Sequence, residues 1–134
     1  MKPDIIFICV KNAGRSQMAA AFATAASRGT LLVASAGSNP ATEIHSEVLA
    51  AMSEIGIDLS KQKPQSILQA APDGARVAVT MGCGDTCPTL NAERRIEWDI
   101  EDPSGKPLFA VRAIRDHLEK KVEILLRELG YDFQ

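Results

Sequence analysis

Residues 5–19 read IIFICVKNAGRSQMA, and this stretch decides the fold. The continuous apolar run at 5–8 is typical of a strand that is buried on both faces. Gly14 indicates a tight turn, and the alanine-rich sequence after it predicts a helix with Ser16 as its N-cap. A strand, a short loop and a helix in succession are the opening unit of an α/β fold. The loop of that unit begins at Cys9.

The rest of the chain continues the alternation of strands and helices. Further strands are predicted at 30–36, 77–81 and 95–99, and helices at 16–27, 44–55, 66–70 and from 108 onward. Strands that alternate with helices indicate a parallel sheet. We therefore predict an α/β fold with a small four-stranded parallel sheet and helices on both faces, in a single domain over residues 1–134.

The net charge, the length of the apolar stretches and the number of cysteines limit the kinds of function that the sequence allows. The net charge of −2, without a lysine or arginine cluster, argues against a nucleic-acid partner. The sequence contains no signal peptide and no apolar stretch of membrane-spanning length, so we expect a cytoplasmic protein without a membrane partner. In that reducing compartment, the three cysteines are more often catalytic, redox-active or metal-binding than structural.

The loop after Cys9 has the composition of an oxyanion site. A loop that leads from a strand into a helix can turn successive N–H groups toward a tetrahedral anion and favour a thiolate beneath it. Arg15 can bind two anion oxygens, Ser16 can donate its hydroxyl to Cys9, and Asn12 can hold the loop's shape. The predicted binding residues are Val10, Lys11, Asn12, Ala13, Gly14, Arg15 and Ser16. Cys9 could also be a buried thiol that ends the strand. We favour the nucleophile, because glycine, arginine, serine and a helix follow in order.

Two further cysteines lie in TMGCGDTCP, residues 80–88. One interpretation is half of a structural zinc site, but the two histidines, His45 and His117, are isolated in the sequence. A second is a pair of unrelated thiols. A third is a dithiol, Cys83 and Cys87, that can close into a disulfide.

Asp102 lies in EWDIEDPSG, residues 97–105, at the end of the last predicted strand. Asp-Pro is a common turn, which would explain the pair without any function. A carboxyl group near Cys9 can instead protonate an oxygen that leaves the central atom of an oxyanion. Because the carboxyl ends of parallel strands share one edge of the sheet, we favour the catalytic role.

Together these motifs resemble a known family. FICVKNAGRSQMA, SAG at 35–37, MGCGDTCP, EDPSG and VRAIRDHLEKKVEILL at 111–126 are similar to arsenate reductases on the low-molecular-weight tyrosine phosphatase fold, in particular the thioredoxin-coupled group. The resemblance implies that Cys9 attacks arsenate, Arg15 binds its oxygens and Asp102 protonates the departing hydroxide. Cys83 then attacks Cys9 and releases arsenite, and Cys87 attacks Cys83. The Cys83–Cys87 disulfide is left for thioredoxin, or another redoxin, to reduce, and no cofactor is implied.

The sequence departs from the reductase pattern in two places. The pattern often has a glutamate after SQMA that helps hold a potassium ion, and here Ala20 stands there. Asn12 and Ser35 match the remaining parts of that site, which is therefore incomplete, and we assign no metal. The Cys83–Cys87 spacing is also shorter than in the best-known members.

The main alternative is a low-molecular-weight protein tyrosine phosphatase, which would use the same Cys9, Arg15 and Asp102. Phosphatases of this fold usually carry aromatic residues after the Asp-Pro pair, and here Ser104 and Gly105 follow. A small inorganic oxyanion therefore fits better than a phosphotyrosine ring. A non-catalytic redox sensor or anion-binding module is a third alternative, but it leaves the positions of Arg15 and Asp102 unexplained.

Overall fold

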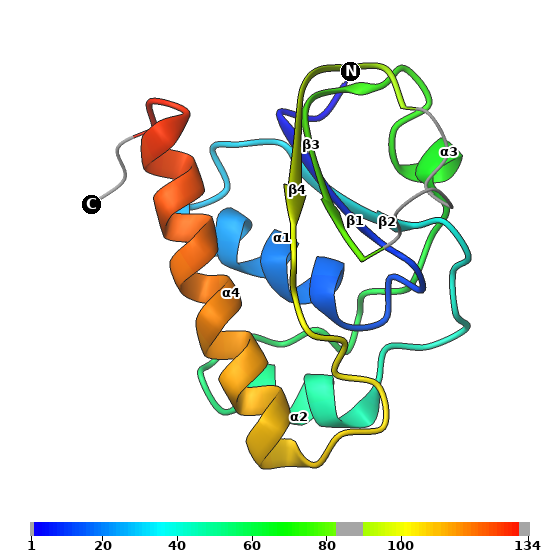
Figure 1. The fold of residues 1–134 in the computed structure, drawn as a ribbon, viewed down its shortest axis with the longest axis vertical. Helices are drawn as coiled ribbons and strands as arrows, with labels where there is room; N and C mark the ends of the chain where they lie inside the picture. Colours follow the sequence, from blue (N-terminus) through cyan, green and yellow to red (C-terminus); the bar gives the residue numbers. More distant parts are fainter. Residues whose placement is uncertain (1, 83–89, 132–134) are drawn as a thin grey trace.

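The computed structural model describes residues 2–82 and 90–131, which contain both strands and helices (Figure 1). The elements are β1 (Ile5–Cys9), α1 (Arg15–Ala26), β2 (Val33–Gly37), α2 (Ser46–Ser53), α3 (Ile67–Ala70), β3 (Ala75–Met81), β4 (Ala92–Trp98) and α4 (Leu108–Glu128). The strands form one parallel sheet in the order β2-β1-β3-β4. The predicted α/β fold with a four-stranded parallel sheet is confirmed. No helix in the described ranges is long and apolar enough to cross a membrane.

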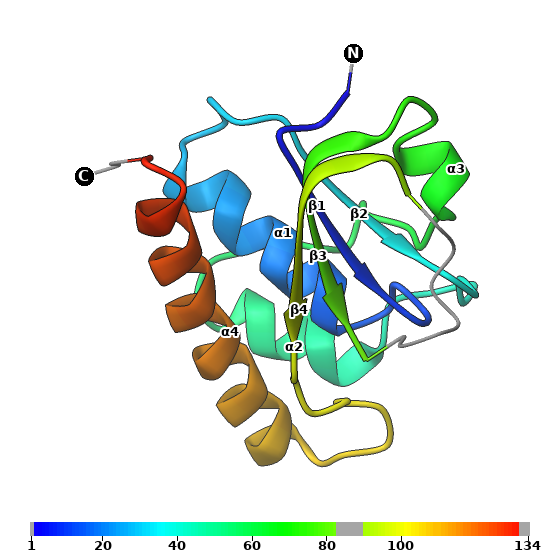
Figure 2. The same ribbon diagram turned by 45° about the horizontal axis from the view of Figure 1, so that its top comes forward.

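Side chains of β1 alternate between the two faces of the sheet, because successive residues of a strand point to opposite sides. Ile5, Phe7 and Cys9 pack into the larger core, to which α1, α2 and α4 contribute their apolar residues. Ile6 and Ile8 pack on the other face, against α3 and the residues around it. Helices therefore cover both faces, with the three longer ones on one side and α3 on the other (Figures 1 and 2).

Several predicted boundaries differ from the structure. Ser16 is not the N-cap of α1, because Gly14 occupies that position and the Ser16 hydroxyl has other partners. The second strand begins at Val33 instead of residue 30, and the fourth covers Ala92–Trp98 instead of 95–99. The helix predicted at 44–55 is shorter, and α2 covers Ser46–Ser53.

Arg115 of α4 ties that helix to the end of α2. The last carbonyl groups of a helix lack partners within the helix. Here the guanidinium of Arg115 donates to the Ala51 carbonyl at 2.8 Å and to Glu54 Oε1 at 3.0 Å, while Arg112 binds the same carboxylate from solvent. Arg115 is buried, so the Ala51 carbonyl would be left without this donor if the side chain were shortened.

Replacing Arg115 with methionine should destabilise the fold more than replacing Arg112. Arg115→Met removes the donor to a carbonyl in the interior, a loss of about 1–2 kcal/mol in the free energy of unfolding. Arg112→Met removes only a solvent-exposed ion pair, so it should cost clearly less. Urea unfolding of both variants measures the difference, and equal losses would contradict this role for Arg115.

The contribution of Glu54 should depend on pH. Its pKa lies below the ordinary value of 4.5, mainly because of its hydrogen bond with Arg112. A carboxylate with a lowered pKa in the folded state stabilises the fold above its unfolded pKa, and that stabilisation is lost as the pH falls through the folded pKa. Glu54→Gln should therefore lower the melting temperature at neutral pH, and the gap to wild type should close below pH 4.5. A gap that stays constant down to acid pH would contradict this expectation.

Candidate active site

Cys9 is the last residue of β1 and lies at the carboxyl edge of the sheet, opposite Gly37 of β2. Its thiol is free and buried, and its sulfur lies 2.9 Å from the Ser16 hydroxyl. The Ser16 oxygen also accepts a hydrogen bond from Asn12 Nδ2 at 2.7 Å. Because that oxygen already accepts from Asn12, the hydroxyl proton is available to the sulfur. The expected contact between Ser16 and Cys9 is therefore present.

The carbonyl groups of the loop after Cys9 point toward the segment 38–45. They accept hydrogen bonds from its backbone N–H groups: Ser38 to Cys9 at 3.1 Å, Asn39 to Val10 at 2.8 Å, Ala41 to Lys11 at 2.9 Å and His45 to Ala13 at 3.0 Å. In a trans peptide the next N–H points away from the carbonyl, and the described chain contains no cis peptide. The N–H groups of residues 10, 11, 12 and 14 therefore face away from that segment, as an anion-binding loop requires.

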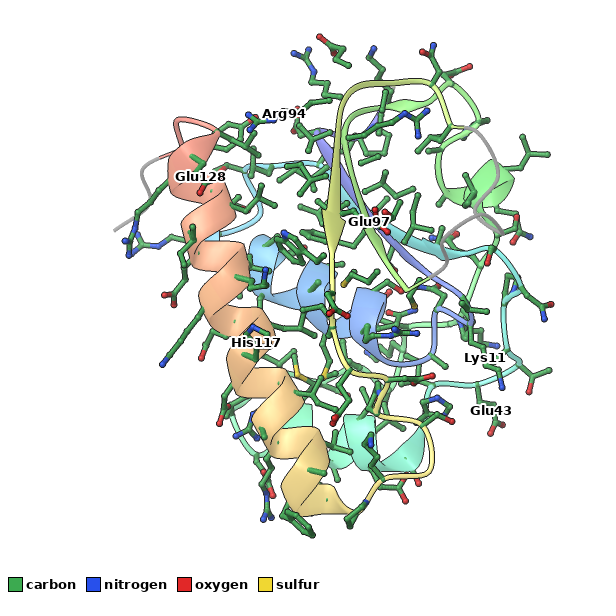
Figure 3. All side chains as sticks on the ribbon, in the orientation of Figure 1. Lys11, Glu43, Arg94, Glu97, His117 and Glu128 are labelled. Carbon is green, nitrogen blue, oxygen red and sulfur yellow. The ribbon has the colours of Figure 1, made fainter. Side chains whose placement is uncertain are left out.

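Close approach between the loop and β2 depends on Gly37. A Cβ at this position would lie 2.6 Å from the Val10 carbonyl oxygen and 3.0 Å from the Asn12 nitrogen. Any side chain would therefore push the loop away from the segment that orients it. Lys11 extends outward from the loop at the molecular surface (Figure 3).

Asn12 fixes the middle of the loop. Its backbone is in the left-handed region, with φ of 54°, a conformation that asparagine tolerates better than most residues. Its side chain is fully buried, and its Oδ1 accepts hydrogen bonds from Gln17 Nε2 at 3.1 Å and from the Gln65 backbone N–H at 3.0 Å. This role of Asn12 was expected from the sequence, but the part played by the two glutamines was not.

Arg15 of the loop contacts residues from the two other predicted motifs, at 80–88 and at 97–105. Its guanidinium is buried and donates to the Ile100 carbonyl at 3.1 Å, while its Nη2 lies 3.7 Å from Asp102 Oδ2. A Cβ on Gly82 would overlap this guanidinium, so the backbone of residue 82 also lies against it. Arg15, Asp102 and the residue before Cys83 therefore meet at one edge of the sheet.

The Asp102 side chain forms a local turn and also faces Arg15. Its Oδ1 accepts the Ser104 N–H at 3.0 Å, which is the local turn, and its other oxygen faces Arg15. The next residue, Pro103, packs on the loop so closely that a Cβ on Gly14 would lie 2.8 Å from the proline Cγ. The same Cβ on Gly14 would lie 3.6 Å from the His45 ring, and no role for His45 was expected from the sequence.

The residues near Asn12 and Ser35 do not fit a potassium ion. Such an ion needs several oxygen ligands that point at it together. Here the oxygens of Asn12 accept hydrogen bonds from Gln17, and the Ser35 carbonyl accepts one from Gln65 at 3.0 Å. The carboxylate expected at residue 20 is replaced by alanine.

Cys83 and Cys87 lie outside the described residues. The described ranges contain no cluster of three or more histidine, cysteine, aspartate or glutamate side chains that could hold a metal ion.

Comparison with known proteins identifies the family. The chain matches the family of low molecular weight phosphotyrosine protein phosphatases over residues 4–134. The glutaredoxin arsenate reductase of Synechocystis sp. is 33% identical over 129 residues, which are 94% of this chain and 98% of that protein.

Two solved structures are also similar. The thioredoxin-dependent arsenate reductase of Corynebacterium glutamicum is 32% identical with a TM-score of 0.80, and the match covers 96% of this chain and 62% of that chain. An arsenate reductase in the phosphate binding state is 34% identical with a TM-score of 0.83, covering 96% of this chain and 98% of that chain. The chain therefore belongs to the low molecular weight phosphotyrosine protein phosphatase family, and its relatives place it among the arsenate reductases of that family.

Proposed function

We propose that this protein reduces arsenate to arsenite by a relay of three cysteines that a redoxin regenerates. The observation that carries the proposal is the arrangement at the end of β1. A buried thiol, Cys9, lies at the start of a loop whose N–H groups are turned to one side, and the Arg15 guanidinium borders the same edge of the sheet. These groups suit a tetrahedral oxyanion, and the names of the relatives point to arsenate.

In the first step the Cys9 thiolate attacks arsenic. A sulfur–arsenic bond forms, an arsenic–oxygen bond breaks, and the leaving hydroxide takes a proton from Asp102 and departs as water. The Ser16 hydroxyl, 2.9 Å from the sulfur, stabilises the thiolate before the attack. Arg15 and the loop N–H groups hold the remaining oxygens.

The second step reduces the arsenic. The Cys83 thiolate attacks the Cys9 sulfur, and the electron pair of the sulfur–arsenic bond stays on arsenic, which leaves as arsenite. Cys87 then attacks Cys83, which frees Cys9 and forms the Cys83–Cys87 disulfide. The contact between Gly82 and Arg15 supports this order, because the residue that comes after Gly82 is Cys83.

The last step needs a two-electron reductant for the disulfide. We propose thioredoxin, in line with the thioredoxin-dependent enzyme of C. glutamicum. The Synechocystis relative is named for glutaredoxin, so a glutathione and glutaredoxin system is the matched comparison.

A phosphatase would use the same first step on a phosphate ester. The residues that come after Asp102 favour the inorganic oxyanion. Pro103 packs against the loop. The next three residues are Ser104, Gly105 and Lys106, and none of them has an aromatic side chain that could hold a phosphotyrosine ring.

The three cysteines should have separable roles. Wild type should consume NADPH when arsenate, thioredoxin and thioredoxin reductase are present. Cys9→Ser should lose all activity, because a serine hydroxyl is not ionised at neutral pH. Cys83→Ser should fail to turn over arsenate. Cys87→Ser should stop after one turnover with a Cys9–Cys83 disulfide, which peptide mapping detects.

Two outcomes would contradict the relay. Normal arsenate reduction by Cys83→Ser with thioredoxin as the only reductant would exclude the three-cysteine mechanism. The phosphatase would be favoured if Cys83→Ser and Cys87→Ser hydrolyse an aryl phosphate at the wild-type rate, Cys9→Ser does not, and arsenate produces no disulfide.

Gly82→Ala should weaken oxyanion binding, whereas Gly56→Ala should not. Both glycines have positive φ, so both substitutions introduce similar backbone strain. Only the Cβ at residue 82 overlaps the Arg15 guanidinium, and Gly56 has no atom within 4 Å of the new carbon. In Gly82→Ala, we expect the sulfate concentration that protects Cys9 from alkylation to rise about tenfold, because the anion loses a hydrogen bond to a charged group. Equal protection in the two variants would show that Gly82 does not position Arg15.

A further inference from the structure

The segment 99–107 connects β4 to α4 and carries Asp102 (Figure 1). The Asp102 side chain is exposed, and its contact with Arg15 at 3.7 Å is too long for a hydrogen bond. The hydrogen bond that it accepts from the Ser104 N–H lies within its own turn. These two contacts do not fix where the carboxyl group lies relative to Cys9. Its position therefore depends on how the segment is anchored to the rest of the site.

Pro103 anchors this segment to the oxyanion loop. Within residues 101–107, all of which the structure describes, it is the one buried residue. Its ring packs on Gly14, because a Cβ added to that glycine would lie 2.8 Å from the proline Cγ and 3.6 Å from its Cδ. The His45 ring borders the same position at 3.6 Å. The proline thus occupies space that a side chain at residue 14 would take.

A second anchor lies on the other side of Asp102. The Ile100 side chain is buried in the larger core, and the Ile100 carbonyl accepts a hydrogen bond from Arg15 at 3.1 Å. Asp102 is therefore held between two fixed points of the chain. One of them contacts Arg15 and the other contacts Gly14, so two adjacent residues of the loop set the position of the carboxyl group.

The loop is the more firmly held partner in the contact with Pro103. Its carbonyl groups accept four backbone hydrogen bonds from the segment 38–45, whereas the Pro103 carbonyl accepts its hydrogen bond from a residue of its own turn. Carbon atoms pack at about 3.5–4.0 Å, so a Cβ at residue 14 would require a shift of roughly 0.7 Å or more. The segment with the proline should make that shift, and Asp102 should move with it because the two residues are adjacent.

We propose that Gly14 and Pro103 are positioning residues for the acid. The absence of a side chain at residue 14 lets the proline ring lie against the loop, and this contact places the Asp102 carboxyl group where it can protonate the departing oxygen. The proposal rests on the acid role of Asp102 in the proposed function. It concerns the placement of the proton donor, because a side chain at residue 14 leaves the N–H of that residue unchanged. The rate of the first step and the affinity for the anion should therefore respond differently.

Gly14→Ala should slow the first step more than it weakens anion binding. In a single turnover with arsenate and no redoxin, thiol titration after an acid quench follows the formation of the disulfide. At saturating arsenate we expect its rate to fall about a hundredfold, because a general acid loses most of its effect when it is misplaced. The half-saturating arsenate concentration should change by less than about threefold, since the loop N–H groups and Arg15 remain. Equal losses in both quantities would overturn the proposal.

Ser104→Ala is the matched control. Ser104 is exposed in the same segment, and the N–H that it donates to Asp102 belongs to the backbone and is kept. This variant should have the wild-type rate and the wild-type half-saturating concentration. A loss as large as that of Gly14→Ala would mean that any change in the segment displaces the acid, which would contradict a specific role for the contact between Gly14 and Pro103.

Combined variants test whether Gly14 acts through Pro103 and Asp102. Pro103→Ala removes the Cγ and should slow the first step by itself, because the anchor is lost. Adding Gly14→Ala to Pro103→Ala, or to Asp102→Asn, should cost no further rate, since residues that act through one contact are not additive. Additive losses in either pair would overturn the proposal. If Gly14→Ala does not fold, Pro103→Ala combined with Asp102→Asn makes the same comparison, with the same two readings.

Asp102→Asn separates a failure of this proposal from a failure of the mechanism. A wild-type rate in Asp102→Asn would exclude the acid role and the positioning role together. A slow Asp102→Asn beside a wild-type rate in Gly14→Ala would keep the acid and overturn only the positioning role. If the wild-type protein reduces no arsenate, the reductase function fails. The same rates are then compared for hydrolysis of an aryl phosphate, whose departing oxygen also takes a proton.

Discussion

The site depends on how the loop after β1 is paired with the segment 38–45. That segment satisfies the carbonyl groups of the loop, and the planar trans peptide then turns the neighbouring N–H groups to the opposite side. The donors are thus oriented by the fold before an anion arrives, so little reorganisation remains for binding or reaction. Gly37 makes the pairing possible, because no larger residue leaves room for the Val10 carbonyl.

Arg15 adds an incompletely neutralised charge to this arrangement. A buried guanidinium is unfavourable unless its donors and its charge are satisfied. One donor of Arg15 binds the Ile100 carbonyl, and Asp102, the carboxylate paired with it in the part of the chain that the structure describes, lies 3.7 Å away and is largely exposed. An oxyanion in the loop would supply the missing negative charge and use the remaining donors. The fold therefore favours the bound state electrostatically, independently of which tetrahedral anion occupies it.

The sequence predicted the order of the elements better than their ends. The apolar run at 5–8 and the alternation of strands and helices are local patterns, and they led to the correct sheet. The contact of Ser16 with Cys9 was expected, but Ser16 was wrongly predicted to be the N-cap of α1 as well, because a serine near the start of a helix has the same sequence signature in either role. The start of β4 was missed because Glu93 and Arg94 are exposed on an edge strand, where charged residues hide the strand pattern.

The candidate site was also predictable only in part, because local sequence patterns do not show contacts between distant parts of the chain. Cys9, Arg15 and Asp102 were expected together because the carboxyl ends of parallel strands share one edge. The Ile100 carbonyl, the close approach of Gly82 and the amides of Gln17 and Gln65 come from tertiary packing, which no local pattern encodes. The sequence thus led to the groups that we propose contact an anion, and it missed most of the residues that hold those groups in place.

The shared first step explains why a phosphatase family can include reductases. In the proposed mechanism, binding and attack use the loop, Arg15 and Asp102, and these groups are indifferent to whether the central atom is phosphorus or arsenic. Reduction requires only that a second thiol reach the first while the adduct persists, and arsenic accepts the electron pair that phosphorus in phosphate does not. The difference between the two activities therefore depends on the residues after Gly82 and on those after Asp102, since neither segment forms the anion loop itself.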